Sequence, residues 1–405
     1  MALILAPAAW AGDRVLVVGE DSIRERWDPM LPPDVERISP APPPAVAAGG
    51  PSVKQSLARA LAQGSISRRQ HVLYTLIYKE ALAARSRRGV ARRCRNQIGR
   101  VLRILAAVSA NGDLGAARMR PLFLTLRRNA EFWVQEPRVR SGQRVTFERD
   151  PLVLQHYAGY GIQIQPLGSA GKANGLWKQC DETPRLCREA RLHALLESLL
   201  TTASQRAGGK AWEYWFPFGG GYPPWASGMA QATAMQALSR GAIFFGEPRF
   251  MIAARAALPL FREPPPVGVR ARTKRGHHFL LYSFAPRLRV LNGFLQAVTG
   301  LHDYAKLSGD RRARRLFRSG DRAARRETPR YDTGKWSYYA LPNKNRSTIE
   351  YHALVTGFLE NLCDRTGARV YCRIAKRFTR YLNRRGGPPS PPSGEPPSGP
   401  RCGYL

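Results

Sequence analysis

Apolar positions from Val53 to about residue 133 recur at the three- and four-residue spacing of an α-helix. Gly64 and the Asn111-Gly112 pair interrupt this pattern, as residues at helix ends do. The clearest repeats are Val72, Leu73, Leu76 and Ile77 in one segment and Ile98, Val101, Leu102, Ile104 and Leu105 in the next. Residues 53–137 are therefore predicted to form an N-terminal helical region of three or four helices.

The period of the pattern changes over residues 138–180. The stretch QRVTFERDPLVLQHYAGYGIQIQ alternates apolar and polar positions around Asp150-Pro151 and Gly159. Alternation with period two is typical of half-buried strands, and the interruptions suit turns. This region is predicted to be a β-hairpin or small sheet.

Helical spacing returns over residues 181–385. The predicted helices span 185–205, 228–246, 247–261, 288–307, 312–326, 349–363 and 370–383. A second hairpin-like stretch, VGVRARTKRGHHFLLYSF, has its turn near Lys274–Gly276. Helix pairs interspersed with short β elements favour a fold that is mainly α with β insertions, in which residues 181–385 form an α/α-barrel (toroid)-like helical domain, over a parallel sheet.

Both ends of the chain differ in composition from its middle. Residues 1–12, MALILAPAAWAG, are interpreted as a truncated secretory signal, with a buried first strand leading into DRVLVVG as the alternative. Residues 13–52 are predicted to be a Pro/Ala-rich extended segment, and residues 386–405 a disordered Pro/Gly/Ser tail. The sequence has no later run of 18 apolar residues, so we expect no membrane span. We expect a secreted or cell-surface location, with a cytoplasmic one as the alternative.

The charge of the chain restricts its partners. Lysine and arginine number 64 against 29 acidic residues, which gives a formal net charge of +35. Such a surface attracts polyanions, and nucleic acid, anionic lipid and acidic glycan all qualify. The sequence has no zinc-finger spacing and no RNP-type motif, so no nucleic-acid partner is expected.

The six cysteines have no spacing typical of a zinc site. Cys363 and Cys372 flank a turn-like segment that would bring two helix ends within disulfide range. Cys180 and Cys187 form a second plausible local pair. Free buried thiols are an equally good interpretation of either pair.

Residues 212–241 combine aromatic residues with three consecutive glycines. Aromatic faces beside small residues suit the apolar face of a sugar ring, because glycine lets the backbone approach a ligand closely. Tyr222 and Trp225 are the candidates for this contact. A core-facing aromatic loop is the alternative. Ser227 occupies the position of a helix N-cap, and the helix that follows could face an anionic group.

Two stretches in the last third carry the most specific pattern: YSFAPRLRVLNGFLQAVTGLHDYAKLSGD at 282–310 and YDTGKWSYYALPNKNRSTIEYHALVTGFLENLC at 331–363. Their order, VLNGF, a GLHDY-type helix, YDTG, a second tyrosine and a YH dipeptide, resembles the catalytic region of glucuronyl C5-epimerases, which make iduronate in heparan-type polysaccharides. The resemblance extends over roughly residues 120–385. The short loop between Tyr339 and Tyr351 is similar to that of bacterial members.

The resemblance implies an isomerase that acts on an anionic, glucuronate-containing polysaccharide without a cofactor or a metal. It implies three catalytic residues, Tyr282, Tyr339 and Tyr351, with Tyr338 as an alternative to its neighbour. The implied substrate-binding residues are Tyr222, Trp225, Gln231, Asn292, Arg346 and His352. The oligomeric state is open, with a homodimer as one option.

Tyrosine suits this reaction for chemical reasons. The hydrogen at C5 of glucuronate is α to a carboxylate, so its inversion needs a base on one face of the sugar, stabilisation of an enolate-like dianion, and an acid on the other face. Tyrosine serves either role if a cation lowers its usual pKa of about 10. The candidate cations are Lys335, Lys344, Arg287, Arg289 and, as the preferred one, Arg346.

One position departs from the family pattern. Where the family usually has a glutamate before the first tyrosine, this chain has Leu281, which can neither take nor give a proton. Either the tyrosines supply both groups, or His277 or His278 substitutes, or activity is reduced or altered. Two other functions therefore stay open: a polysaccharide lyase that uses the same C5 carbanion for β-elimination, and a polyuronate-binding protein without catalysis.

Overall fold

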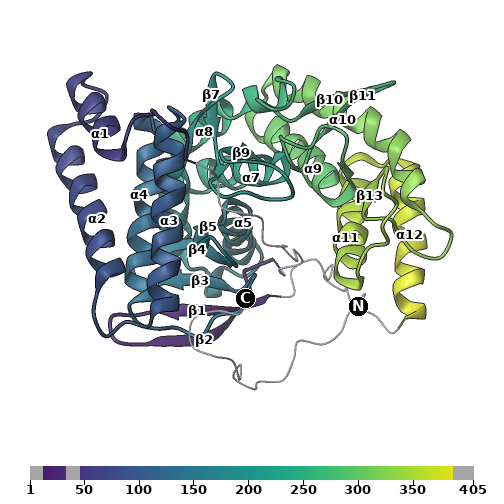
Figure 1. Cartoon of the computed structure of the whole chain (residues 1–405). Helices are drawn as coiled ribbons and strands as arrows, with labels where there is room; N and C mark the ends of the chain where they lie inside the picture. Colours follow the sequence, from purple (N-terminus) through teal and green to yellow (C-terminus); the bar gives the residue numbers. More distant parts are fainter. Residues whose placement is uncertain (1–11, 33–45, 386–405) are drawn as a thin grey trace.

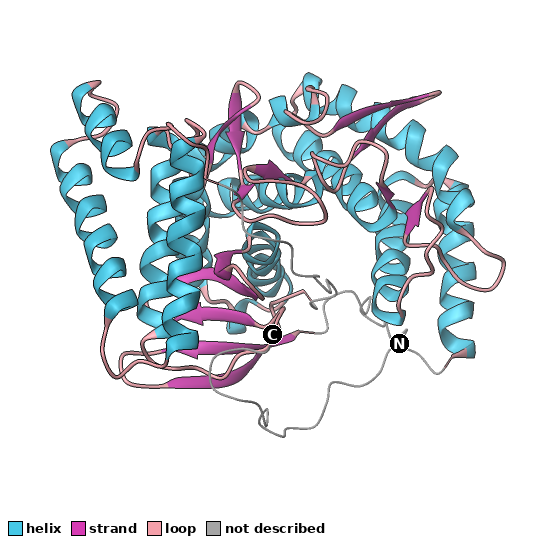
Figure 2. Cartoon of the chain, in the orientation of Figure 1, coloured by secondary structure: helices cyan, strands magenta, loops and turns pink. Residues whose placement is uncertain are grey.

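The computed structural model describes residues 12–32 and 46–385. Its elements follow one another in an arc, from purple helices on the left to the yellow α12 (Arg369–Arg384) on the right (Figure 1). Helices make up most of the molecule and strands form small groups between them (Figure 2). The predicted class, mainly α with β insertions, is confirmed. The expected signal segment and C-terminal tail lie outside the described residues, except for Gly12.

Four helices occupy the region predicted to be helical: α1 (Val53–Ala62), α2 (Arg68–Ser86), α3 (Arg92–Ala110) and α4 (Ala116–Trp133). The first two begin with capping boxes. The side chain of Ser52 accepts a hydrogen bond from the Gln55 N–H while the Gln55 side chain accepts one from the Ser52 N–H, and Ser67 and Gln70 repeat the pattern. Each box satisfies helix N–H groups that would otherwise lack partners.

A five-stranded sheet packs beside these helices in the order β2-β1-β3-β4-β5. Its strands are β1 (Asp13–Val18), β2 (Ile23–Asp28), β3 (Arg144–Phe147), β4 (Asp150–Tyr157) and β5 (Gly161–Ile164). β1 runs parallel to β3, and the other neighbours are antiparallel. The first part of segment 13–52 is thus a hairpin and not an irregular extension, because its alternating DRVLVV sequence supplies a strand that pairs with β3.

A second correction concerns the end of the predicted β region. Residues 166–180 belong to helix α5 (Pro166–Glu182) and not to the sheet. Pro166 occupies the first helical position, where its missing N–H costs nothing, and the Gln165 side chain accepts a hydrogen bond from the Gly168 N–H. The strand pattern therefore ends at Gln165.

The remaining helices follow in sequence. They are α6 (Glu189–Thr202), α7 (Gly228–Phe245), α8 (Pro248–Ala256), α9 (Leu291–Ser308), α10 (Arg311–Glu327), α11 (Ile349–Thr366) and α12 (Arg369–Arg384), with 3₁₀ turns at Pro184–Leu186, Leu258–Phe261 and Thr328–Tyr331. The short two-stranded pairs between them are β6 (Ser204–Arg206) with β7 (Gly209–Ala211), β8 (Glu213–Tyr214) with β9 (Trp225–Ala226), β10 (Arg270–Thr273) with β11 (Gly276–Phe279), and β12 (Arg289–Val290) with β13 (Ala340–Leu341).

Helices α7, α9 and α11 form an inner layer, and α8, α10 and α12 each pack on the helix that precedes them. The three inner helices run in the same direction, because residues late in each of them meet: Arg240 and Arg365 both hydrogen bond to Asp303. Each also ends on a left-handed glycine, Gly246, Gly309 or Gly367. This repeated pairing confirms the α/α-barrel-like arrangement of the helical domain.

Both predicted cysteine pairs are disulfides. Cys363–Cys372 joins α11 to α12, and Cys180–Cys187 joins the end of α5 to the segment before α6. Among the helices that the structure describes, none is long and apolar enough to cross a membrane.

Candidate active site

The three predicted catalytic tyrosines lie near the N-terminal ends of the inner helices. Tyr351 is in the first turn of α11. The backbone carbonyl of Tyr339 accepts a hydrogen bond from the N–H of Leu291, the first residue of α9. Tyr282 follows Leu281, whose side chain packs on Gly293 in the first turn of α9. The start of α9 is therefore the common neighbour of all three segments.

Tyr339 and Tyr351 are brought together directly. Their ring centroids lie 4.7 Å apart, with the rings tilted by 55°. The pairing of β12 with β13, in which Val290 lies opposite Ala340, fixes Tyr339, and the Thr348 side chain caps α11 by accepting a hydrogen bond from the Tyr351 N–H. The phenol groups of two residues on different elements thus share one site.

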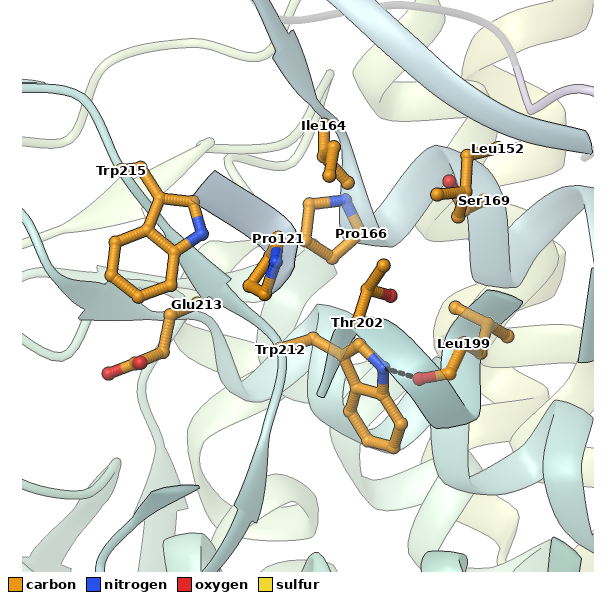
Figure 3. A pocket seen from close by; sticks show the side chains of 10 residues that line it. All are labelled: Pro121, Leu152, Ile164, Pro166, Ser169, Leu199, Thr202, Trp212, Glu213 and Trp215. Carbon is orange, nitrogen blue, oxygen red and sulfur yellow. Dashed lines mark hydrogen bonds between the residues drawn. The ribbon is translucent and has the colours of Figure 1, made fainter. Parts of the chain in front are cut away.

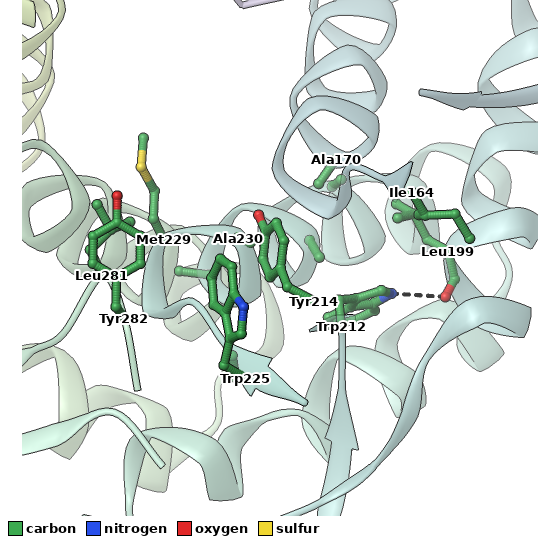
Figure 4. Packing of buried hydrophobic residues seen from close by; sticks show 14 of the residues in the cluster. Ile164, Ala170, Leu199, Trp212, Tyr214, Trp225, Met229, Ala230, Leu281 and Tyr282 are labelled. Carbon is green, nitrogen blue, oxygen red and sulfur yellow. Dashed lines mark hydrogen bonds between the residues drawn. The ribbon is translucent and has the colours of Figure 1, made fainter. Parts of the chain in front are cut away.

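Tyr282 belongs to an aromatic cluster formed by the 212–226 loop. Its ring lies 5.1 Å from that of Phe218, 5.8 Å from Trp225 and 5.5 Å from Phe284. Figure 4 shows Tyr282 and Leu281 beside Trp225, with Tyr214 on the other side of the indole. This cluster holds Tyr282 against the loop predicted to seat a sugar ring.

The two aromatic residues predicted to contact substrate differ in position. Tyr222, at the loop tip, is 65% exposed and available to a ligand. Trp225 is buried, stacks on Tyr214 with ring centroids 4.1 Å apart, and donates its indole N–H to the Phe216 carbonyl. Trp225 therefore supports the loop from inside, as in the alternative interpretation of this segment as core.

Gln231 does not face a ligand. Its side chain is buried, donates to the Lys210 and Ala257 carbonyls and accepts a hydrogen bond from the Trp212 N–H. These bonds tie the first turn of α7 to two neighbouring segments. Both polar atoms of the amide are thus used within the protein, which favours a structural role over the predicted substrate-binding one.

His352 is likewise enclosed. Its ring stacks on Trp336 at 3.8 Å, Nδ1 lies 2.7 Å from the Ser337 hydroxyl, and Nε2 lies 3.2 Å from the Phe378 carbonyl oxygen. Burial lowers the pKa of His352 to about 4, although the hydrogen bond to the Phe378 carbonyl raises it. The contacts of this neutral histidine favour a role in anchoring the turn of α11 that carries Tyr351 over the predicted contact with substrate.

Asn292 and Arg346 remain compatible with substrate binding. Asn292 is the second residue of α9 and is 4% exposed, and its Oδ1 has no hydrogen-bond partner among the described residues. A buried acceptor without a partner is costly, so a donor on a ligand would stabilise it. Arg346 lies on the exposed loop before α11, where its backbone bridges to Tyr338.

The two histidines proposed to replace the missing glutamate engage helix α10. His278 is buried, stacks on Phe294 at 3.9 Å, and its Nδ1 lies 2.7 Å from a carboxylate oxygen of Glu327. His277 Nδ1 lies 2.8 Å from the Ser319 hydroxyl. Burial lowers the pKa of both histidines. Their contacts on α10 favour packing roles, and the position of the family glutamate is filled by the buried Leu281.

Residues 209–380 match the family model described as D-glucuronyl C5-epimerase C-terminus. These residues, called the C5-epimerase family region below, are similar to that family. D-glucuronyl C5-epimerase of Caenorhabditis elegans is 28% identical over 178 residues, which cover 39% of this chain and 29% of that protein. An uncharacterized protein of Methanocaldococcus jannaschii is 27% identical over 161 residues, which cover 38% of this chain and 51% of that one.

The chain spans between about a third and a half of the length of these curated relatives. Among solved structures, the endo-β-1,4-glucanase CMCax from Acetobacter xylinum is similar with a TM-score of 0.39 and 14% identity, over 55% of this chain and 69% of that one. The C5-epimerase family region begins at the β6–β7 hairpin and contains all nine predicted site residues.

The C5-epimerase region also contains a buried polar network that the sequence did not identify. Asp303, in the GLHDY stretch of α9, accepts hydrogen bonds from Gln236, Arg240 and Arg365. Burial raises the pKa of Asp303, but the hydrogen bonds from His302 and Arg365 outweigh it and hold the pKa well below its usual range. A single aspartate among the apolar positions of the predicted helix was the available signal.

A small cavity of about 10 Å³ lies where the aromatic loop meets the N-terminal helices, the sheet and α6 (Figure 3). Its lining includes Trp212 and Glu213. The buried Glu213 carboxylate pairs with the Arg118 Nε at 3.0 Å and the Arg206 Nη1 at 2.8 Å. The cavity has room for about one water molecule, so its walls serve to fasten the loop.

Among the described residues, one cluster of side chains could bind a metal ion. It consists of His193 and Glu197 on α6 and Glu247 before α8. His193 Nε2 lies 2.7 Å from a Glu247 oxygen, and the Arg249 guanidinium is ion-paired with both glutamates. Arg249 already supplies the positive charge that a metal would bring.

Proposed function

We propose that this chain inverts C5 of glucuronate residues in an acidic polysaccharide, by removing the C5 proton on one face and returning a proton on the other. The observation that carries the proposal is the convergence of Tyr282, Tyr339 and Tyr351 at the N-terminal ends of three parallel helices. Helix N-termini favour negative charge. An enolate dianion formed there would be stabilised where it develops.

The residues divide into roles. A tyrosinate among the three takes the C5 proton, the C–H electrons move into the carboxylate to form the enolate, and a neutral tyrosine on the opposite face delivers a proton to C5. Tyr222 offers an exposed aromatic face for a sugar ring, and Asn292 a buried acceptor for a sugar hydroxyl. Arg346, on the exposed loop, is proposed to pair with the carboxylate. No cofactor takes part in this scheme.

A second function is favoured by one observation. Leu281 is 3% exposed and packs on Gly293, so no carboxylic acid stands where the family usually has one. A polyuronate-binding protein that keeps the exposed Tyr222 and the three tyrosines without turnover would have this arrangement. The lyase reaction starts from the same carbanion and differs only in expelling the 4-oxygen.

The deciding experiment is incubation of the protein with an unsulfated glucuronate polymer in deuterated water. Deuterium at C5, seen by NMR, supports epimerisation, whereas absorbance of a new C4–C5 double bond supports the lyase. Binding of the polymer with neither signal supports the non-catalytic function. Binding of DNA in place of the polymer, in competition at matched charge, would contradict all three.

The disulfides support a proposal about the compartment. Disulfide bonds persist in oxidising compartments and are rare in the cytosol. The described residues contain two, Cys180–Cys187 and Cys363–Cys372. We therefore propose secretion or display at the cell surface, where an acidic polysaccharide is accessible. The homodimer stays a prediction.

A further inference from the structure

A polar hollow of about 200 Å³ lies between helices α2 and α3, outside the family region. Its lining consists of Arg85, Asn96, Gly99, Arg100 and Arg103. On α3, three of these residues follow Asn96 by three, four and seven positions, which places them with Asn96 on one face of the helix. Three guanidinium groups therefore converge on one cavity whose lining contains no carboxylate.

Two other arginines of this region are neutralised by carboxylates. Arg118 pairs with Asp113 and Glu213, and Arg128 pairs with Glu131 and Asp150. Within residues 12–32 and 46–385, by contrast, the three arginines of the hollow take part in no ion pair. Like charges held together without a counterion repel, so an anion in the hollow would relieve this repulsion.

Two of the three arginines lie against a glycine of a neighbouring segment, whereas Arg103 is exposed. Arg85 Nε lies 3.3 Å from the position that a Cβ on Gly99 would take, so its guanidinium rests on α3 at a residue without a side chain. Arg100 Nη1 lies 3.2 Å from the equivalent position on Gly159, in the turn between β4 and β5. Planar groups fixed in advance lose less entropy when they bind an oxyanion.

We propose that this hollow binds a carboxylate or sulfate group of the acidic polysaccharide, as an accessory site remote from the tyrosines. The volume is below the roughly 300 Å³ of the smallest typical ligand pockets, which suits one charged group and not a whole oligosaccharide. Helices α3 and α11 lie on opposite sides of the arc (Figure 1). A long polymer can reach both sites, and a short fragment cannot. The choice of polymer rests on the proposed function.

The test compares two triple variants with equal loss of charge. One is Arg85→Gln/Arg100→Gln/Arg103→Gln in the hollow; the control is Arg59→Gln/Arg68→Gln/Arg69→Gln, all exposed on α1 and α2. Binding of a labelled, unsulfated glucuronate polymer is measured by fluorescence anisotropy at fixed salt. Loss of charge-assisted, geometrically fixed contacts should weaken binding about tenfold or more in the hollow variant and less than about threefold in the control.

Equal losses in the two variants would overturn the proposal, because general charge would then explain binding. Binding of duplex DNA with the same contrast would overturn the choice of a glycan. A contrast seen only with a sulfated polymer supports the site and identifies sulfate as its group. The single variant Arg103→Gln, at an exposed position, gives the same readout if the triple variant does not fold. Deuterium exchange on a short oligosaccharide tests the tyrosines separately, so failure of either proposal is recognised by itself.

Discussion

The two ends of helices α7, α9 and α11 are built differently. At the C-terminal end, Asp303 is surrounded by Gln236, Arg240 and Arg365, and every charge has a partner. At the N-terminal end, Tyr339 and Tyr351 meet. Ser227 and Thr348 cap α7 and α11, whereas α9 has no side-chain cap at Val290. The same helices thus carry a closed, stabilising end and an end at which the start of α9 keeps polar groups for a ligand.

This difference has a physical basis. A buried ion network stabilises a fold only when all its charges are paired, so it must exclude ligands. A site must instead keep hydrogen-bonding capacity unused until substrate arrives, as the Oδ1 of Asn292 does. Separating the two along one set of helices lets the network hold the helices rigid while the opposite end stays receptive.

The strongest test of the N-terminal end removes the phenol hydroxyls of its tyrosines. Tyr339→Phe and Tyr351→Phe should each lower C5 deuterium exchange by roughly 100- to 10,000-fold, the range of general acid–base contributions. Thermal unfolding should change little because the rings stay in contact. Tyr338→Phe is the matched control at the adjacent position and should keep most of the exchange rate. Loss in the control with retention in Tyr339→Phe would move the role to Tyr338.

The closed end should respond in stability. Asp303→Asn leaves Arg240 and Arg365 without their shared carboxylate, and we expect a loss of about 3–5 kcal/mol in the free energy of unfolding. Urea denaturation measures it. The control, Asp364→Asn at an exposed position of α11, should cost less than about 1 kcal/mol. Similar stability of the two variants would show that the network is not the stabilising end.

Acid should weaken the support of the tyrosine end. Burial lowers the pKa of His352 to about 4, whereas an unfolded histidine titrates near 6.5. The unfolded state binds the proton first, so this contribution is complete above about pH 6.5 and is lost as the pH falls toward 4, by up to roughly 3 kcal/mol.

The measurement is urea unfolding at a series of pH values in the parent chain and in His352→Gln. The variant should show a shallower loss of stability toward low pH. Buried His156, whose pKa burial also lowers to about 4, titrates in both proteins and cancels in the comparison. Parallel curves would show that His352 is already accessible to protons in the folded state.

The smallest effect is expected at Leu281, which packs against the first turn of α9. Leu281→Glu should cost about 1–3 kcal/mol, because it places a carboxyl in a packed contact with Gly293. If the missing acid limits turnover, C5 exchange should rise. Leu281→Gln introduces a side chain with the shape of glutamate but without its acid, and it should leave C5 exchange unchanged. Equal exchange in both variants would mean that the tyrosines supply both proton-transfer groups.

Sequence patterns located most of the helices because their signals are local. The α10 helix, predicted over 312–326, spans Arg311–Glu327, and the turn of the second hairpin lies at Lys274 and Arg275 as expected. The patterns failed where a partner distant in sequence decides the outcome. β1 becomes a strand by pairing with β3, which lies more than a hundred residues later. Long-range pairing leaves little trace in a local window.

The site residues divide in the same way. The order of the motifs was enough to place Tyr339 and Tyr351 in one site. Whether a polar side chain faces a ligand or the protein depends on what packs around it, and Gln231 and His352 proved to be fully engaged by backbone and side-chain partners. No spacing rule reports that environment.

The sequence by itself determined the mainly helical class, the positive charge and the C5-epimerase motifs, because each depends on residue type and short-range order. It indicated two local cysteine pairs, and the structure showed that both are disulfides. Only the tertiary structure decided which of those residues remain available. It placed the tyrosines at helix N-termini and buried Trp225, and it gathered Arg85 from α2 with Arg100 and Arg103 from α3 around one hollow. Burial and partnership are properties of the packed chain, and they set which polar groups a ligand can reach.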